Sequence, residues 1–126
     1  MRAPSPRTFH LFAEIVAVED VRENRAAWLS PEEELGLAGK PAMSAAGFVA
    51  LKKAILRLLL HAAPDARFGA KDIVLGHAGN GAPVILSMPS IPGRCVAGIA
   101  RRTRVSISHT KTHGCGLAVL EEGADA

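Results

Sequence analysis

The sequence predicts a single-domain α+β protein in which one long helix packs on a small antiparallel sheet. Two observations predict this fold class. A helical pattern of apolar residues runs from about Ser44 to Ala63, and short apolar runs typical of strands lie before and after it. No internal repeat or domain linker interrupts the 126 residues, a length that suits one domain. The helix and the strands are therefore expected to bury their apolar faces against each other.

The first strand is expected between Thr8 and Val18. Its apolar residues are Phe9, Leu11, Phe12, Ile15, Val16 and Val18. Glu14 lies inside this stretch, and a buried carboxylate is costly unless it has a partner or reaches solvent. Within the domain, residues 1–126, the segments 1–7 and 122–126 are expected to be loose tails.

Two short helices are expected before the long one. Glu19 to Trp28 reads as a polar helical segment. The next helix begins after Ser30, which is a good N-cap, and Pro31 occupies the first helical position. Three glutamates follow in the first turn, where the helix dipole favours negative charge. Gly36, Gly39 and Pro41 are expected to end this helix early.

The long helix is predicted to have an apolar face and a basic stripe. The apolar face is formed by Phe48, Leu51, Ala54, Ile55, Leu58, Leu59 and Ala62, at spacings of three and four. Lys53, Arg57 and His61 lie four residues apart on the other side. The stripe is interpreted either as a solvated surface or as a ligand-binding surface.

A hairpin is predicted within residues 71–87. Asp72 to Gly76 begins a strand, Asn80-Gly81 is a strong turn signal, and Pro83 to Ser87 supplies the returning strand. A longer loop that includes the intervening His77-Ala78-Gly79 is the alternative interpretation. The glycine-rich segment is not a phosphate-binding loop, because it lacks a Lys-Ser/Thr ending and opens no helix.

The C-terminal part predicts two further strands around a polar turn. Val105 to Ser108 alternates apolar and hydroxyl residues, and Leu117 to Leu120 is a short apolar run. The turn from Ser108 to His113 gathers hydroxyls, imidazoles and an ammonium group. Side chains at these strand ends are expected to converge on a ligand. A short helix or irregular segment is expected over Arg94 to Arg102.

The charge is uneven although the net charge is only +3. No acid occurs between Glu34 and Asp65 or between Asp72 and Glu121. The positive potential expected there suits a phosphorylated cofactor, an acidic protein or a nucleic acid, or else a solvated basic face. An aromatic content of 4% argues against a surface that stacks single-stranded bases.

The cysteines and the N-terminus indicate a cytoplasmic protein. Cys95 and Cys115 do not have the spacing of a metal pair and are interpreted as reduced thiols. The apolar run near the N-terminus is short and is broken by Glu14, so it is predicted to be neither a signal peptide nor a membrane span.

Four segments, in the same order and at similar separations, resemble the motifs of the holo-[acyl-carrier-protein] synthases, the small 4'-phosphopantetheinyl transferases. Residues 28–33 resemble a Phe-Leu-Thr-x-x-Glu element, and residues 48–56 occupy the place of a Phe-Ala-x-Lys-Glu-Ala helix. Residues 81–84 resemble Gly-Lys-Pro, and residues 105–110 resemble the C-terminal motif.

This resemblance implies the 4'-phosphopantetheinyl transferase fold and transfer of 4'-phosphopantetheine from coenzyme A to a serine of an acyl carrier protein, in fatty acid or polyketide biosynthesis. It implies a homotrimer in which Ser108 and His109 of one protomer face Glu14 and Arg57 of another. The residues implied to bind the cofactor are Lys52, Arg57, Gly81, Pro83, Ser108, His109 and Thr110, and those implied in catalysis are Glu14, Lys53 and His109.

The departure from the family pattern concerns magnesium. In the family an Asp on the first strand and a Glu on the long helix hold Mg²⁺ at the coenzyme A pyrophosphate. Here Glu14 corresponds to the Asp, but Lys53 corresponds to the Glu, and no acid lies on the long helix. An ammonium group repels Mg²⁺ and is expected to pair with Glu14 or to contact phosphate directly. Transferase activity is therefore expected to be impaired or to have an altered metal dependence.

Three functions follow as hypotheses. The first is a transferase of this family. The second is a protein of the same fold that has lost transferase activity and binds or acts on an acyl carrier protein or its phosphopantetheine-tethered substrate. The third is a generic nucleic-acid-binding domain, which lacks stacking aromatics and a recognition-helix motif. The prediction favours the first and includes no nucleic acid or membrane as a partner.

Overall fold

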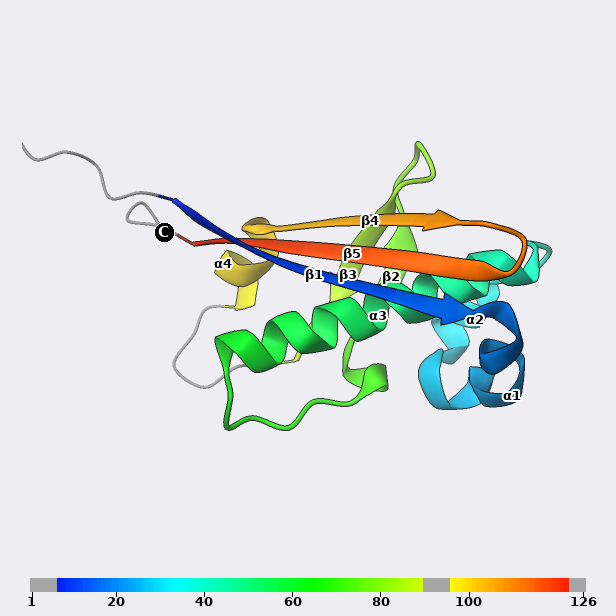
Figure 1. Ribbon diagram of the computed structural model, residues 1–126, viewed down its shortest axis with the longest axis horizontal. Coiled ribbons are helices and arrows are strands. Elements are labelled where there is room, and N and C mark those ends of the chain that lie inside the picture. The colour runs from blue at the N-terminus through cyan, green and yellow to red at the C-terminus, as the bar shows by residue number, and fades with distance from the viewer. Residues whose placement is uncertain (1–6, 90–95, 123–126) are drawn as a thin grey trace, which may run out of the picture.

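The computed structural model describes residues 7–89 and 96–122. It has the predicted single-domain α+β architecture, with a long helix lying along a three-stranded sheet (Figure 1). Its elements are, in order, β1 (Thr8–Ala17), α1 (Val18–Trp28), α2 (Pro31–Leu37), α3 (Ala42–Ala62), a 3₁₀ turn (Ala70–Asp72), β2 (Val74–His77), β3 (Pro83–Ser87), α4 (Val96–Arg101), β4 (Thr103–His109) and β5 (His113–Glu122).

The three-stranded sheet is antiparallel and has the order β1-β5-β4. The C-terminal strand β5 is central because it pairs with both of the others. Both C-terminal strands are longer than the sequence predicted. Each extends through polar or glycine residues that have no strand signal of their own, because ladder hydrogen bonds to a neighbouring strand hold them extended.

The helix α3 packs directly on β5 at two glycines. A Cβ atom added at Gly116 would collide with the backbone of Leu51, and one added at Gly114 would collide with the backbone of Ala46 and Gly47. Glycine is therefore required at these positions because the helix backbone approaches the strand too closely for any side chain. This contact fixes α3 along the middle of the sheet.

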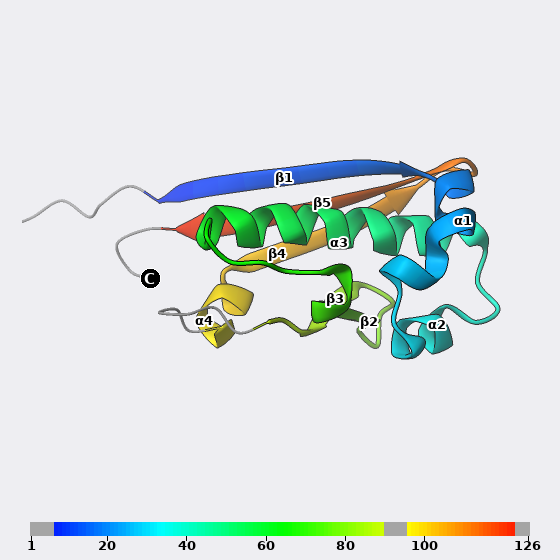
Figure 2. The same cartoon turned by 90° about the horizontal axis from the view of Figure 1, so that it is seen from below.

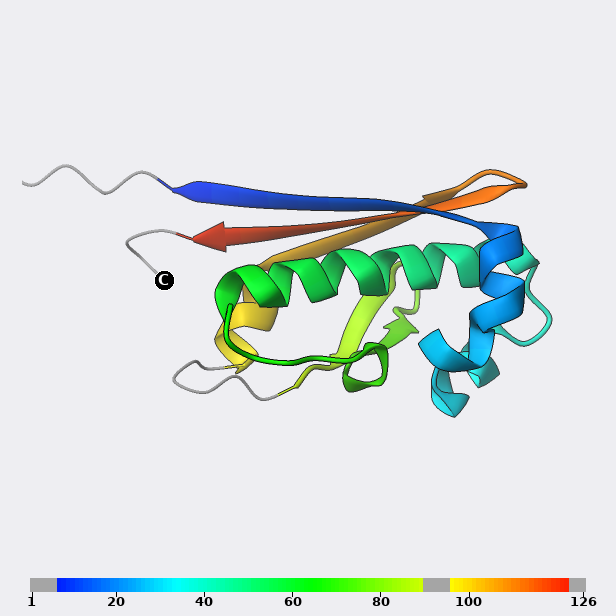
Figure 3. The same ribbon diagram turned by 60° about the horizontal axis from the view of Figure 1, so that its bottom comes forward.

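The predicted apolar face of α3 is confirmed as the centre of the core. All seven of its predicted residues are buried: Phe48, Leu51, Ala54, Ile55, Leu58, Leu59 and Ala62. Side chains from the sheet and from the hairpin complete the core, among them Ile73, Leu75, Ala118 and Leu120. The β2–β3 hairpin lies on the far side of α3 from β1 (Figures 2 and 3).

The hairpin forms as predicted except at its start. Asp72 is not in the strand but ends the 3₁₀ turn, where its carboxylate accepts a hydrogen bond of 2.7 Å from the Gly69 amide. This local capping bond competes with strand pairing. The turn contains Gly81 at φ +86°, and the Asn80 carboxamide oxygen accepts a hydrogen bond of 3.0 Å from the Ala82 amide.

The predicted start of α2 is confirmed in detail. The Ser30 hydroxyl accepts a hydrogen bond from the Glu33 amide, and the Glu33 carboxylate accepts one from the Ser30 amide. Pro31 occupies the first turn, as expected. This reciprocal capping box fixes the position of the Glu33 carboxylate, which is 1% exposed.

The chain ends differ in part from the prediction. Glu122 is not in a loose tail but is the last residue of β5, and Arg7 forms an ion pair of 3.1 Å with Glu121. The rest of both predicted tails, together with Arg94 and Cys95, lies outside the described residues. Among helices in the described ranges, none is long and apolar enough to cross a bilayer.

The face of the sheet turned away from α3 is apolar, and no element within the described ranges covers it. We call it the outer sheet face, and its members are Phe9, Leu11, Ala13 and Ile15 of β1 and Cys115, Leu117 and Val119 of β5. Phe9, Leu11 and Ile15 are 62%, 63% and 70% exposed. Exposure of neighbouring large apolar side chains on one face marks an interaction surface.

Candidate functional site

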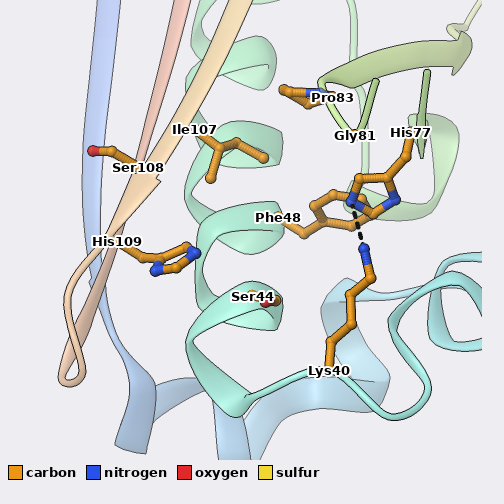
Figure 4. Close-up of a pocket in the computed structure, with 9 residues that line it drawn as sticks. All are labelled: Lys40, Ser44, Phe48, His77, Gly81, Pro83, Ile107, Ser108 and His109. Carbon is orange, nitrogen blue, oxygen red and sulfur yellow. Dashed lines mark hydrogen bonds between the residues drawn. The ribbon is translucent and has the colours of Figure 1, made fainter. Parts of the chain in front are cut away.

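A pocket of about 370 Å³ lies between α3, the β2–β3 hairpin and β4 (Figure 4). Three elements that are distant in the sequence form its walls, because the hairpin and β4 both lie against the first half of α3. Its lining combines apolar and cationic side chains: Lys40, Ser44, Phe48, His77, Gly81, Pro83, Ile107, Ser108 and His109.

The hairpin side of the pocket has a stacked pair of rings. The imidazole of His77 stacks on Phe48, with ring centroids 4.9 Å apart and an interplanar angle of 25°. The Lys40 ammonium lies 3.5 Å from His77 Nε2 (Figure 4). Burial lowers the pKa of His77 below its usual value, and the Lys40 charge lowers it further. An anion bound here would relieve that repulsion.

Four predicted cofactor-binding residues line this pocket: Gly81 and Pro83 on the hairpin, and Ser108 and His109 at the end of β4. The His109 ring points toward α3 and Ser44 (Figure 4). Two lining residues that the sequence did not single out, Lys40 and His77, add further cationic or ionisable groups. The arrangement can bind a phosphorylated ligand, since these groups supply positive charge or N–H donors beside an apolar floor.

Ser108 and a fifth predicted binding residue, Thr110, do not turn their side chains toward the pocket's interior. The Ser108 side chain lies on the opposite face of β4 and points away from the other labelled residues, although Ser108 borders the pocket (Figure 4). The Thr110 hydroxyl accepts hydrogen bonds from the amides of Thr112 and His113, at 3.3 and 3.1 Å. Thr110 therefore stabilises the β4–β5 turn.

Lys52 was predicted to bind the cofactor, but the structure places it in the core. Its side chain is 0% exposed, and its ammonium donates to the Glu33 carboxylate at 2.5 Å and to the Trp28 carbonyl at 2.7 Å. The physical reason is its helical position, which lies between the buried neighbours Leu51 and Ile55. In this conformation Lys52 does not reach a ligand at the surface.

Glu14 and the predicted basic stripe lie on the other side of α3, next to β1. Arg57 Nη1 donates to Glu14 Oε1 at 3.4 Å and to the Ala13 carbonyl at 3.3 Å. Of the two alternatives for Lys53, the ion pair with Glu14 is not found among the described residues, where the Lys53 ammonium lies 5.0 Å from the centroid of the Trp28 ring. The partner of the Glu14 carboxylate is thus Arg57, one helical turn farther along α3.

The predicted site residues are therefore divided between two sides of α3. On the sheet, Glu14 pairs with Gly116, which pairs in turn with Ile107, so the three positions lie in one row. The helix backbone lies directly on the central position, Gly116. It separates Glu14 and Arg57 on the β1 side from His109 on the β4 side within one chain.

The donor atoms around Glu14 do not fit a magnesium ion. Mg²⁺ requires near-octahedral oxygen ligands and is usually held by one or two carboxylates with phosphate and water. Here the Glu14 carboxylate is already half of an ion pair with Arg57, and α3 carries no acid that could supply a second ligand. Arg57 and Lys53 instead add positive charge next to β1.

Sequence reasoning missed Lys40, Ser44 and His77. Lys40 lies in the acid-free stretch, and His77 lies in the predicted hairpin loop, but they are 37 residues apart. Neither belongs to a motif, so no local pattern connects them. Phe48 was recognised only as part of a helix motif, although its ring forms the floor under His77.

Comparisons with known proteins identify the fold. No family model and no curated protein sequence matches the chain. Among solved structures, the apo-ACPS of Chronobacterium ammoniagenes is 14% identical, with a TM-score of 0.73, and the match covers 94% of this chain and 100% of that one.

Two further structures agree over nearly the same length. The holo-[acyl-carrier-protein] synthase of Neisseria meningitidis is 24% identical, with a TM-score of 0.65, and the match covers 89% of this chain and 97% of that one. The Helicobacter pylori enzyme, solved in complex with coenzyme A, is 20% identical, with a TM-score of 0.62 and coverage of 88% and 99%. At these identities the likeness concerns the fold. The chain accordingly has the fold of the holo-[acyl-carrier-protein] synthases.

Proposed function

We propose that this protein is a divergent holo-[acyl-carrier-protein] synthase that transfers 4'-phosphopantetheine from coenzyme A to a serine of an acyl carrier protein. The observation that carries this proposal is the pocket that Lys40, His77 and His109 line beside Phe48, in a fold shared with a synthase solved with coenzyme A. Its charge and its apolar floor suit the phosphates and the adenine of that ligand. We place this activity in the cytoplasm.

The proposed reaction is a phosphoryl transfer. The serine oxygen of the carrier protein attacks the β-phosphorus of coenzyme A, and a new P–O bond forms. The bond from that phosphorus to the bridging oxygen breaks, and 3',5'-adenosine bisphosphate leaves. Catalysis of such a transfer rests on positioning and on charge stabilisation. In this proposal His109 is placed to accept the serine proton, while Lys40 and Arg57 stabilise phosphate charge.

We further propose that the active unit is a homotrimer assembled through the outer sheet face. This face is apolar on β1 and β5, and the β4 residues that border it, Arg104, Ser106 and Ser108, are exposed and polar. An apolar patch with a polar rim is the usual composition of a protein interface.

Assembly would also explain why the site residues are divided within one chain. In this assembly, contact across the outer sheet face brings Glu14 of β1 and its partner Arg57 of α3 in one copy toward Ser108 and His109 at the end of β4 in another. A phosphate bound between copies would then meet Arg57 from one protomer and His109 from its neighbour. The outward direction of the Ser108 hydroxyl fits this arrangement.

A second candidate function is favoured by the Glu14–Arg57 ion pair. Since Glu14 and α3 do not offer a magnesium site, the protein in this alternative has lost transferase activity. It would then bind an acyl carrier protein, or act on a substrate tethered to its phosphopantetheine arm. The solvent-accessible basic side chains of α3, the half-buried Lys53 and the exposed Arg57, support an acidic partner of this kind.

The deciding experiment measures phosphopantetheine transfer by intact mass. The protein is incubated with an apo acyl carrier protein and coenzyme A, with Mg²⁺ and with chelator. The first proposal expects the carrier protein to gain the phosphopantetheine mass. His109→Gln should reduce the rate at least about tenfold, whereas His113→Gln, which changes an exposed histidine outside the pocket, should not. Absence of mass gain under both conditions would reject the transferase.

The same assay distinguishes the two candidates by Lys53→Glu. If the protein is a transferase limited by its missing ligand, this variant should gain a dependence on Mg²⁺. If the protein only binds carrier proteins, affinity measured by calorimetry should persist while neither form transfers the group. High wild-type turnover would eliminate the second candidate.

A further inference from the structure

The start of β1 and the ends of β5 and α3 lie at the same end of the molecule (Figures 1 and 2). These three segments supply a cluster of two histidines and one glutamate. We propose that His10, His61 and Glu122 form a binding site for a divalent transition metal of the Zn²⁺ class. The site is complete within one chain. It is independent of the coenzyme A pocket and does not rest on the proposed function.

The geometry brings the three ligand atoms close together. One nitrogen each from His10 and His61 and one carboxylate oxygen of Glu122 lie within 4.8 Å of one another. His10 Nε2 is already 3.1 Å from Glu122 Oε2, and the two imidazole centroids are 4.1 Å apart. Ligands of a tetrahedral Zn²⁺ with bonds of about 2.0–2.2 Å are about 3.4 Å apart. Small side-chain rotations therefore suffice to close the site.

The fold explains why these residues meet. In the β1–β5 register, His10 is opposite Leu120 and Thr8 is opposite Glu122, so His10 and Glu122 are diagonal neighbours on the helix-facing side of the sheet. His61 comes from the last turn of α3. Its ring lies 5.9 Å from that of Phe12, the next residue on the same side of β1. The strand ladder and the end of the helix thus hold all three ligands.

The ligand types select the metal. Imidazole nitrogens suit Zn²⁺ and its transition-metal neighbours, whereas Mg²⁺ prefers oxygen ligands. Two histidines and a carboxylate also form the usual three-ligand set of zinc sites that keep one position for water. His61 is exposed, so solvent reaches the cluster and a water molecule can complete the coordination.

The neighbouring charges are compatible with a bound cation. Arg57, one turn before His61 on α3, is the nearest basic residue of the stripe, and its charge is offset by Glu14. Arg7 pairs with Glu121 on the adjacent β5 position. The ion would cross-link the start of β1, the end of β5 and the end of α3, and would therefore stabilise the folded state.

The test is metal binding by the full chain without an affinity tag, after treatment with chelator. Isothermal titration with Zn²⁺ should show one ion per chain, and titration with Mg²⁺ should show no binding at this cluster. His10→Gln, His61→Gln and Glu122→Gln should each weaken Zn²⁺ binding at least about tenfold. His113→Gln and Cys115→Ser are the matched controls and should leave the affinity unchanged.

Three further readouts accompany the titration, and the two spectroscopic ones use the wild-type protein alone. Co²⁺ bound in place of Zn²⁺ should give d–d absorption bands without a thiolate charge-transfer band, and the His10 and His61 ring signals should shift in NMR spectra. The unfolding temperature should rise with Zn²⁺ in the wild type and not in His61→Gln. Binding that persists in all three ligand variants, or no binding to the wild type, would overturn the proposal.

Discussion

The Lys52 ammonium and the Glu33 carboxylate form an ion pair of 2.5 Å in which both side chains are fully buried. Burial lowers the pKa of Lys52, and the hydrogen bond and charge of Glu33 oppose this shift. Glu33 also accepts hydrogen bonds from the amides of Ser30 and Leu75, each at 2.9 Å. One carboxylate therefore connects α2, α3 and β2.

Removing only one partner of this pair should be costly. Lys52→Met leaves the Glu33 charge buried, and we expect it to reduce the free energy of unfolding by about 3–5 kcal/mol. Adding Glu33→Gln should recover part of this loss, because the unpaired charge is then gone. Urea denaturation of the single and double variants measures both effects. A loss below about 1 kcal/mol for Lys52→Met would contradict a buried, paired ammonium.

The close contact between α3 and β5 predicts that one methyl group added at Gly116 strongly destabilises the protein. In Gly116→Ala the new Cβ meets the Leu51 backbone, which cannot rotate away, so we expect a loss of about 3 kcal/mol or failure to fold. The matched control is Gly36→Ala in α2, where nothing lies within 4 Å. That change should be neutral or stabilise by up to about 1 kcal/mol. Equal denaturation midpoints for both variants would refute the close packing.

The outer sheet face predicts an effect on assembly. Leu11 lies at the centre of the outer sheet face, opposite Val119 on β5, and is 63% exposed. Leu11→Asp should convert the proposed trimer to monomer, as measured by size-exclusion chromatography with light scattering. Leu35→Asp on α2 is the control, since Leu35 is 78% exposed away from this face. A monomeric wild type, or an unchanged mass of the Leu11→Asp variant, would exclude this interface.

The electrostatics of the pocket predict a histidine with a lowered pKa. The pKa of His77 should be below its ordinary value of 6.5, first because packing on Phe48 partly desolvates the ring and second because the Lys40 charge repels the proton. Lys40→Gln should raise the pKa of His77 toward 6.5, because the repulsion by Lys40 is then gone. The shift caused by desolvation of the ring should remain. NMR titration of the ring protons measures this pKa. In this proposal, coenzyme A should also raise it by neutralising Lys40.

The lowered pKa of His77 also makes the stability of the folded protein depend on pH. Between the pKa in the folded protein and the unfolded value of 6.5, the unfolded chain binds more protons at this position. Stability from His77 is therefore fully present above pH 6.5 and decreases as the pH falls through this window. Lys40→Gln should make the loss of stability with falling pH smaller. A His77 pKa at or above 6.5 in the free protein would contradict the pocket's electrostatics.

Much of the fold could be predicted because its signals are local. The cap at Ser30, the turn at Asn80-Gly81 and the apolar spacing of α3 each depend on residues close together in the sequence. The ends of β4 and β5 could not be predicted, because ladder pairing extends them through residues without strand preference. The same holds for Asp72, whose capping bond to Gly69 displaced the start of β2.

The candidate site could be predicted only in part. The motifs located Gly81, Pro83, Ser108 and His109, which line the pocket. They could not show that Lys52 faces the core while Lys53, its neighbour, reaches the Trp28 ring at the surface. Adjacent helical residues point about 100° apart, and which one is buried depends on where α2 and β2 pack.

The sequence alone determined the elements of this protein and the absence of any acid on its long helix, since both follow from residue type and short-range spacing. Only the tertiary structure decided that Arg57 is the partner of Glu14, that Lys52 pairs with Glu33, and that His10, His61 and Glu122 come together. These contacts join segments between 19 and 112 residues apart. Their formation depends on how α3 lies across β5, and no local pattern of residues encodes that position.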